Sequence, residues 1–208
     1  MTTEMNTAIA NTTNMQYVSH HHHNQSDTNV YGFWVYIMSD CILFACLFAT
    51  FAVLHNNTYG GPSAKELFSL PFVFVETMAL LTSSFTCGLM MLALHHNKRK
   101  LAFITLALTF LLGASFVFME LKEFHSLVAE GHDWQRSAFL SSFFTLVGTH
   151  GLHVSLGLLW LIVLAIQLGI HGINNTTMTK MRTFSLFWHF LDIIWILLFT
   201  IVYLVEFI

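Results

Sequence analysis

The stretch Phe139–Gly157 reads FLSSFFTLVGTHGLHVSLG, which is apolar enough to sit in lipid yet contains two histidines and several small residues. Residues spaced alternately by four and three share one face of a helix, and small residues on such a face let a neighbouring backbone approach closely. This pattern is formed here by Ser141, Thr145, Gly148, Leu152 and Ser155. We predict a membrane helix that packs through this face, with His150 and His153 directed away from it.

Composition extends this interpretation to the whole chain. Of the 208 residues, 55% are hydrophobic and only 9% are charged, whereas roughly a quarter of the residues of a soluble domain are charged. Several apolar runs exceed the roughly 18 residues that distinguish a membrane-spanning helix from a buried one. We therefore predict an all-α integral membrane bundle. Basic residues cluster only at Lys98–Lys100, so no nucleic-acid partner is expected.

Five spans follow from the apolar runs, over about residues 31–54, 70–94, 101–121, 139–168 and 184–205. The first 30 residues are polar and lack the features of a cleavable signal peptide. We expect them to form a disordered tail in which His20–His23 are solvated, because nothing nearby would fix a metal geometry. The segment between the third and fourth spans is expected to be an acidic loop that includes Glu120 and Glu123.

The basic residues outside these spans predict the orientation, because short loops rich in Lys and Arg stay on the cytoplasmic side. With the N-terminus inside, the cytoplasmic segments hold Lys98–Lys100, Lys180 and Arg182, against Lys65, Lys122 and Arg136 outside. We predict a cytoplasmic N-terminus and a periplasmic C-terminus.

Titratable residues inside membrane spans are costly and normally face protein or water. The candidates for structural or proton-related buried groups are Asp40, Glu76, His150, His153, His189 and Asp192. At ~1.5 Å per residue, Asp40, His153 and Asp192 are expected at a similar depth, where they could meet. Glu76 is expected in the outer half of the membrane.

These histidines and carboxylates leave two chemical interpretations open. A di-metal bundle site usually draws Glu-x-x-His pairs from several helices, and this chain has no such pair. A haem site would need two histidines that face each other, which the spacing of His150 and His189 does not indicate. Hydrogen bonds between buried side chains of neighbouring helices are the more economical explanation, so we predict no catalytic, cofactor or metal residues in this chain.

Three motifs carry a resemblance to a known family. They are Gly32–Phe44 (GFWVYIMSDCILF), Val147–Val154 (VGTHGLHV) and Phe187–Trp195 (FWHFLDIIW). Together they resemble subunit III of the haem-copper respiratory oxidases, in the family's order and over Tyr31–Tyr203. The five-helix form with a His-bearing tail is most similar to that of the cytochrome o ubiquinol oxidases, whereas the longer form in cytochrome c oxidases has seven helices.

The resemblance implies a non-catalytic subunit of a proton-pumping quinol:oxygen oxidoreductase in the bacterial inner membrane. It places the haems and copper in subunit I, makes subunits I, II and IV and membrane lipids the partners, and gives this subunit a role in stabilising subunit I and sustaining proton delivery. Asp40 matches a position where longer forms carry a membrane-embedded glutamate. The alternatives are subunit III of a cytochrome c oxidase, an independent haem or metal enzyme of the membrane, and a small transporter.

Overall fold

The computed structural model describes residues 31–55, 70–129 and 137–204, and within these ranges every regular element is helical. Among the described residues, five helices are long and apolar enough to cross a membrane, beginning with Tyr31–Leu54. The predicted all-α membrane fold is confirmed. The predicted tail with His20–His23 lies outside the described residues. The chain divides into two compact units, Met1–Asp40 and Cys41–Ile208.

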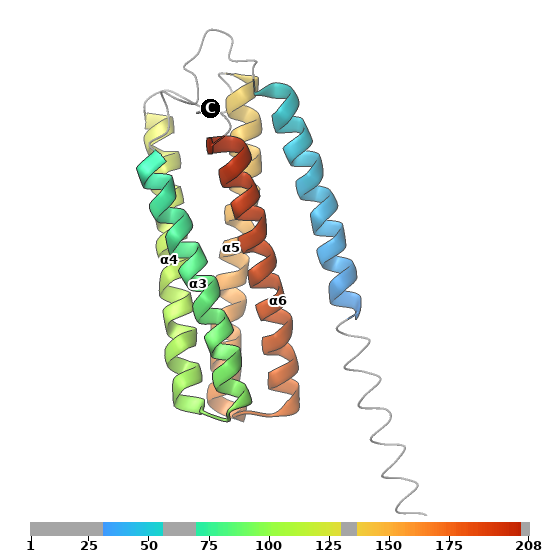
Figure 1. Ribbon diagram of the computed structural model, residues 1–208, viewed down its shortest axis with the longest axis vertical. Helices are drawn as coiled ribbons and strands as arrows, with labels where there is room; N and C mark the ends of the chain where they lie inside the picture. Colours follow the sequence, from blue (N-terminus) through green and yellow to red (C-terminus); the bar gives the residue numbers. More distant parts are fainter. Residues whose placement is uncertain (1–30, 56–69, 130–136, 205–208) are drawn as a thin grey trace, which may run out of the picture. The chain divides into compact units, whose positions relative to one another are not determined.

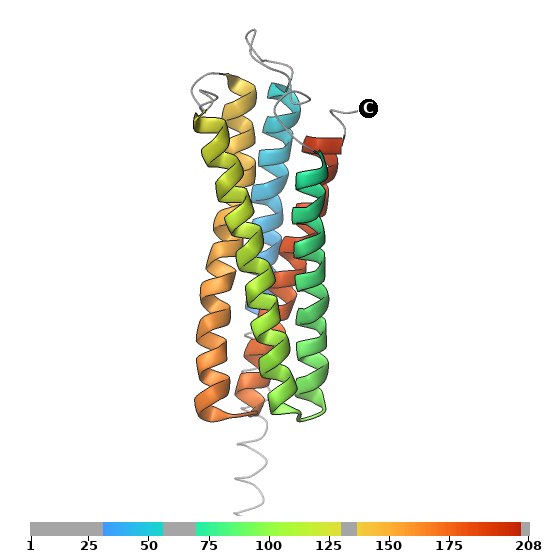
Figure 2. The same ribbon diagram turned by 90° about the vertical axis from the view of Figure 1, so that its left-hand side faces the viewer.

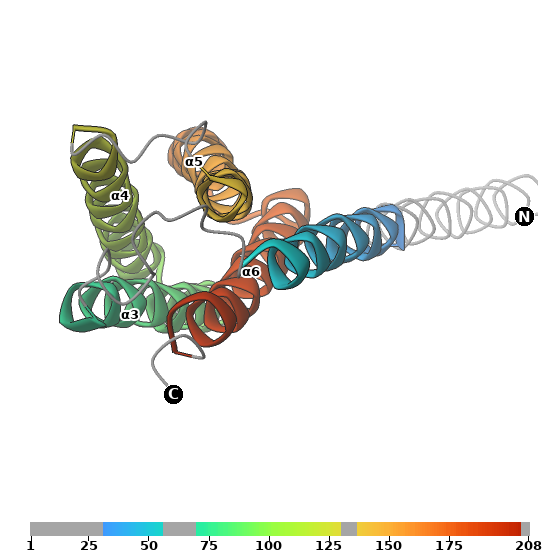
Figure 3. The same ribbon diagram turned by 90° about the horizontal axis from the view of Figure 1, so that it is seen from above.

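The second unit is built around four long helices. They are α3 (Leu70–His95), α4 (Arg99–Ala129), α5 (Ala138–His171) and α6 (Asn175–Leu198), and α6 continues into a π-helical segment, η1 (Phe199–Leu204). Helix α4 packs against α3 and α5, and α6 packs against the same two helices, so that the four form a closed ring when seen end-on (Figure 3). The close turns between α3 and α4 and between α5 and α6 lie at the same end (Figures 1 and 2).

Local sequence signals explain where these helices begin and end. Pro71 occupies the first turn of α3, where the missing N–H costs nothing. Helix α3 ends at His95 and is followed by Asn97, whose φ of 56° is left-handed. The Lys98 N–H closes the turn on the Ala93 carbonyl at 3.0 Å, as in a Schellman motif. The Ser137 hydroxyl accepts a 3.1 Å hydrogen bond from the Leu140 N–H at the start of α5.

The α5–α6 turn is also fixed by specific contacts. Gly172 has a φ of 68°, a conformation that glycine adopts without strain. The Arg99 guanidinium donates hydrogen bonds to the carbonyls of Leu168 and Gly169 at the end of α5, where a cation complements the helix dipole. This connects the start of α4 to the end of α5.

In the described part of the chain, helices extend into two of the expected loops. Helix α4 continues to Ala129, so Glu120 and Glu123 belong to the helix rather than to an acidic loop. Between Gly113 and Ala129 no glycine or proline interrupts it. Helix α6 begins at Asn175 instead of near 184, so Lys180 and Arg182 lie on its first turns. Polar residues there extend the helix beyond the apolar run on which the prediction was based.

The predicted packing face of α5 is wrong. Ser141, Thr145 and Leu152 are exposed, Leu152 by 60%. The helix instead packs through large apolar residues and a few small ones on another face; the buried set is Phe139, Leu140, Ser142, Phe143, Leu146, Val147, His150, Val154, Gly157, Leu158, Leu161, Leu164 and Leu168. Dispersion contacts of these bulky groups therefore decide the orientation of α5 in the bundle.

Candidate functional site

Trp188 lies where all four helices meet. Its side chain comes from α6 and its Nε1 donates a 3.1 Å hydrogen bond to the Ser83 Oγ of α3. A Cβ placed on Gly113 of α4 or on Gly157 of α5 would lie 2.9 Å from the indole ring. The two glycines therefore make room for Trp188, which ties the ring of helices together.

A second tryptophan repeats this connection farther along the antiparallel pair of α3 and α6. Trp195 Nε1 donates a 3.1 Å hydrogen bond to the Thr77 Oγ1, and both residues are buried. The Trp195 ring stands edge-on to Phe116 of α4, with centroids 4.6 Å apart. Each indole N–H is thus paired with a hydroxyl of the facing helix, which satisfies a donor that lipid could not.

His150 is enclosed by aromatic rings. It is fully buried, and its ring centroid lies 5.2 Å from that of Trp195 and 6.0 Å from that of Phe116. Neither ring nitrogen has a hydrogen-bond partner among the described residues. His153, one turn away, has its Nδ1 2.7 Å from the Thr149 carbonyl of its own helix. The two histidines of the opening motif therefore have different surroundings.

Three glutamates interact with one another, two of them, Glu76 and Glu120, in the interior of the four-helix ring and the third, Glu123, half-buried. Glu76 of α3 is fully buried and Glu120 of α4 is 4% exposed. Electrostatic interactions connect Glu120 with both Glu76 and Glu123, and connect Tyr203 of η1 with all three. Both carboxylate oxygens of Glu76 and one of Glu120 lack a hydrogen-bond partner within the described ranges. Glu76 was predicted; Glu120 and Glu123 were missed because they were assigned to a loop.

The Glu120 carboxylate lies directly against the backbone of α5. A Cβ on Gly151 would come within 2.5 to 2.8 Å of the two Glu120 oxygens. Glu120 follows Phe116 by four residues on the buried face of α4, and continuing that periodicity beyond Leu121 to Leu127 would have identified it from the sequence. The motif residue Gly151 thus provides the space for this acid.

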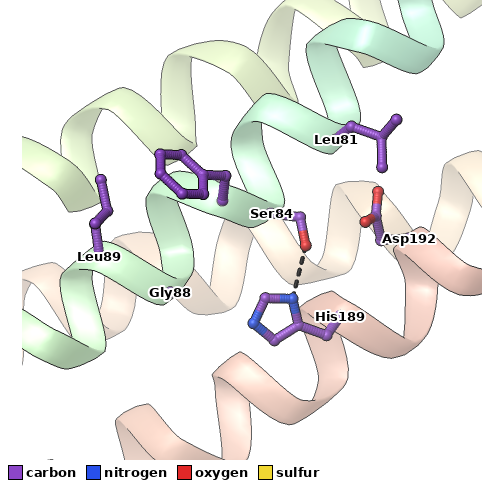
Figure 4. A pocket seen from close by; sticks show the side chains of 7 residues that line it. Leu81, Ser84, Gly88, Leu89, His189 and Asp192 are labelled. Carbon is purple, nitrogen blue, oxygen red and sulfur yellow. Dashed lines mark hydrogen bonds between the residues drawn. The ribbon is translucent and has the colours of Figure 1, made fainter.

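His189 and Asp192 share a different setting, on the wall of a groove between α3 and α6. His189 Nδ1 lies 2.6 Å from the Ser84 Oγ, and Figure 4 shows both α6 side chains directed toward α3. Asp192 interacts with both Ser84 and His189 and is 8% exposed. The groove is otherwise apolar, with Leu81, Phe85, Gly88 and Leu89 completing its lining.

The remaining predicted residue, Asp40, lies within the helix Tyr31–Leu54, at the end of the first compact unit. Across the described parts of the chain, no group of three or more His, Cys, Asp or Glu residues is arranged to hold a metal ion. The arrangement thus consists of inter-helix hydrogen bonds, a buried carboxyl cluster and a polar groove.

Comparison with known proteins assigns the chain to a family. The family described as "Cytochrome c oxidase subunit III" matches residues 5–206. The chain belongs to the cytochrome c oxidase subunit III family. The resemblance seen in the three sequence motifs is thereby confirmed, and the family places the chain in a multi-subunit oxidase as a multi-pass protein of the bacterial inner membrane.

Relatives within the subunit III family carry two kinds of name. "Cytochrome bo(3) ubiquinol oxidase subunit 3" of Pseudomonas aeruginosa is 57% identical over 184 residues, which are 88% of each chain. The protein of that name from Pseudomonas putida is 55% identical over 182 residues, also 88% of each chain. "Cytochrome c oxidase subunit 3" of Bacillus sp. (strain PS3) is 47% identical over 176 residues, 83% of this chain and 84% of that one. A chain of similar length therefore occurs under both names.

Proposed function

We propose that this chain is subunit III of a proton-pumping ubiquinol oxidase, which couples quinol oxidation to oxygen reduction in aerobic respiration. The observation that supports this assignment is the 57% identity, over 88% of both chains, to a relative named as a ubiquinol oxidase subunit. Length alone does not separate the two oxidase types, because a relative named as a cytochrome c oxidase subunit is 47% identical over most of its length. Cytochrome c oxidase is therefore the second candidate.

In this proposal the subunit is structural rather than catalytic. The haems and copper belong to subunit I, which this chain stabilises together with subunits II and IV and membrane lipids. The hydrogen bonds from Trp188 to Ser83 and from Trp195 to Thr77 support such a role, because these polar side chains connect α6 to α3 and so hold the bundle together.

The proton-related part of the proposal concerns the carboxyl cluster of Glu76, Glu120 and Glu123. Ionisable groups buried within membrane proteins are costly and mark proton or ion pathways. We propose that these three residues support proton delivery in the complex. Replacing Glu76 by Gln is expected to lower the number of protons pumped per electron while the bundle stays folded. An unchanged proton-to-electron ratio would assign Glu76 a packing role only.

We also propose that the N-terminus is cytoplasmic. Arg99, Lys180 and Arg182 lie near the α3–α4 and α5–α6 turns, which are at one end of the second unit (Figure 1), and cation-rich ends are retained inside. A reporter enzyme that works only in the periplasm should be active when it is fused after Ile208. A reporter that works only in the cytoplasm should be active when it is inserted at Lys98. The reverse pattern would contradict this orientation.

Haem spectroscopy tests the assignment. An affinity tag on this chain is expected to capture a complex with haem absorbance, whereas the chain separated from its partners should show no haem absorbance and no stoichiometric copper or iron. Stoichiometric metal in the separated chain, lost in His150→Ala or His189→Ala, would instead indicate an independent haem or metal enzyme. Failure to capture any haem protein would also contradict the proposal.

A further inference from the structure

The groove between α3 and α6 contains a polar atom that the described part of the chain does not pair. It is a shallow, open groove of about 350 Å³ lined mainly by apolar side chains. Asp192 is more than nine-tenths buried in its wall. Its carboxyl interacts with Ser84 and His189, yet one of its two oxygens, Oδ1, has no hydrogen-bond partner within residues 31–55, 70–129 and 137–204. Leaving a buried acceptor unpaired is costly, and more so when the acceptor is charged.

The depth of Asp192 restricts what can reach it. Counting ~1.5 Å per residue, Asp192 lies about 12 Å from Phe184, where the apolar run of α6 begins after Arg182 and Thr183, and about 18 Å from Leu204. The hydrocarbon core of a bilayer is about 30 Å thick. Asp192 is therefore near the middle of the membrane, beyond the reach of lipid headgroups, and an acyl chain has no donor to offer.

The opposite wall of the groove is shaped for close contact with another helix. Ser84 and Gly88 lie four residues apart on α3, the spacing at which small residues let two membrane helices approach. A Cβ added to Gly88 would meet no heavy atom within 4 Å. Phe85, beside it, is 67% exposed. The Gly88 backbone is thus accessible from the membrane side.

We propose that this groove is the docking site for a membrane-spanning helix of another oxidase subunit, which presents a hydrogen-bond donor to Asp192 at mid-membrane. The inference rests on the proposed function, since that supplies the partner. A helix satisfies both observations at once: its backbone packs against Ser84 and Gly88, and its side chain pairs the Asp192 oxygen. A small quinol would supply a donor, but it would not use the length of the open, apolar wall.

Gly88→Leu is the sharpest test of the docking site, because the added side chain meets open space in this subunit but fills the groove. With the tag on a different oxidase subunit, the share of purified complexes that retain subunit III should fall about tenfold, which corresponds to about 1.4 kcal/mol of association free energy. Ala107→Leu, at an exposed position of α4, is the control and should leave retention unchanged. Normal retention of Gly88→Leu would overturn the proposal.

Two variants of Asp192 test the donor. Asp192→Leu removes the acceptor, so fewer purified complexes should retain subunit III, as with Gly88→Leu. Asp192→Asn keeps an acceptor oxygen, so most complexes should still retain subunit III. Equal retention of all three proteins would show that no donor pairs with Asp192.

Photo-crosslinking identifies the occupant. A benzophenone-bearing amino acid in place of Phe85 should join subunit III to a hydrophobic segment of another oxidase subunit, identified by mass spectrometry of the adduct. Adducts only to lipid, to ubiquinol or to a second copy of this chain would overturn the proposal. If the complex assembles normally but the residue at position 85 crosslinks only to lipid, ubiquinol or a second copy, the docking proposal is wrong and the proposed function still stands. If no haem protein co-purifies, the proposed function itself is wrong.

Discussion

The indole ring of Trp188 occupies the space above Gly157, where a single added Cβ would lie 2.9 Å from the ring and 3.2 Å from Phe187. Gly113 bounds the same ring from α4. Because Trp188 also bonds Ser83 of α3, one side chain fixes the spacing of four helices. Glycine is required at these two positions by the close approach of the ring.

Enlarging either glycine should therefore weaken the bundle. Gly157→Ala and Gly113→Ala are expected to destabilise it by about 1 to 3 kcal/mol, the usual cost of overpacking, which outweighs the gain of up to ~1 kcal/mol in helix propensity. Thermal unfolding of the purified complex, followed by loss of subunit III, measures the effect. Gly148→Ala is the matched control, because its Cβ would meet only Phe124 at 3.7 Å; a shift of the same size there would contradict the account.

Removing the hydrogen bond of Trp188 without changing its ring should have a smaller effect. Ser83→Ala removes the acceptor of the indole N–H, and with it the 3.2 Å hydrogen bond that Ser83 donates to the Thr109 carbonyl, but leaves the ring between the glycines. Inter-helix hydrogen bonds in membranes average about 0.6 kcal/mol with a maximum of about 1.7. The same thermal measurement applies, with Ser141→Ala, at an exposed position of α5, as the control. Identical melting of Ser83→Ala and wild type would assign Trp188 a purely steric role.

Gly151 and Glu120 should be energetically coupled. Gly151→Ala brings a methyl group against the Glu120 carboxylate and should destabilise the bundle, whereas Glu120→Ala empties that space. In the double variant the alanine methyl has room, so its cost should be smaller than in the single variant, with a coupling energy of about 0.5 to 3 kcal/mol as found for residues in contact. Strict additivity in a double-mutant cycle would show that the two residues do not share this space.

Asp40 provides a separate test in the first membrane helix. Asp40→Asn preserves the shape and hydrogen-bonding capacity of the side chain, so assembly and quinol oxidation should be largely intact. Asp40→Lys places a cation near the middle of Tyr31–Leu54 at a cost of roughly 3 kcal/mol, and subunit III should be lost from the complex during purification. Normal assembly of the lysine variant would indicate that Asp40 faces water or headgroups.

Long apolar runs predicted the helices well because the bilayer itself sets their length and composition. Polar stretches at the ends of the apolar runs were predicted poorly, since Glu120, Glu123 and Lys180 are polar yet helical. A hydropathy criterion detects where a run of apolar side chains ends, whereas a helix ends where its backbone finds a cap, as at Ser137 and Asn97.

The candidate site was predicted only in part, because residue type does not specify which face a side chain occupies. His189 and Asp192 were expected to be buried polar groups facing protein or water, and both line one groove. The small residues around Ser141 and Thr145 were expected to pack, yet both are exposed. Pairings such as Gly157 with Trp188 depend on how four helices meet, and a single sequence contains no direct signal of that geometry.

The electron donor of the native complex tests the central claim most directly. Oxygen consumption by the complex captured through a tag on this chain should be rapid with ubiquinol and negligible with reduced cytochrome c. Rapid oxygen consumption with reduced cytochrome c and none with ubiquinol would contradict the account and assign the chain to a cytochrome c oxidase.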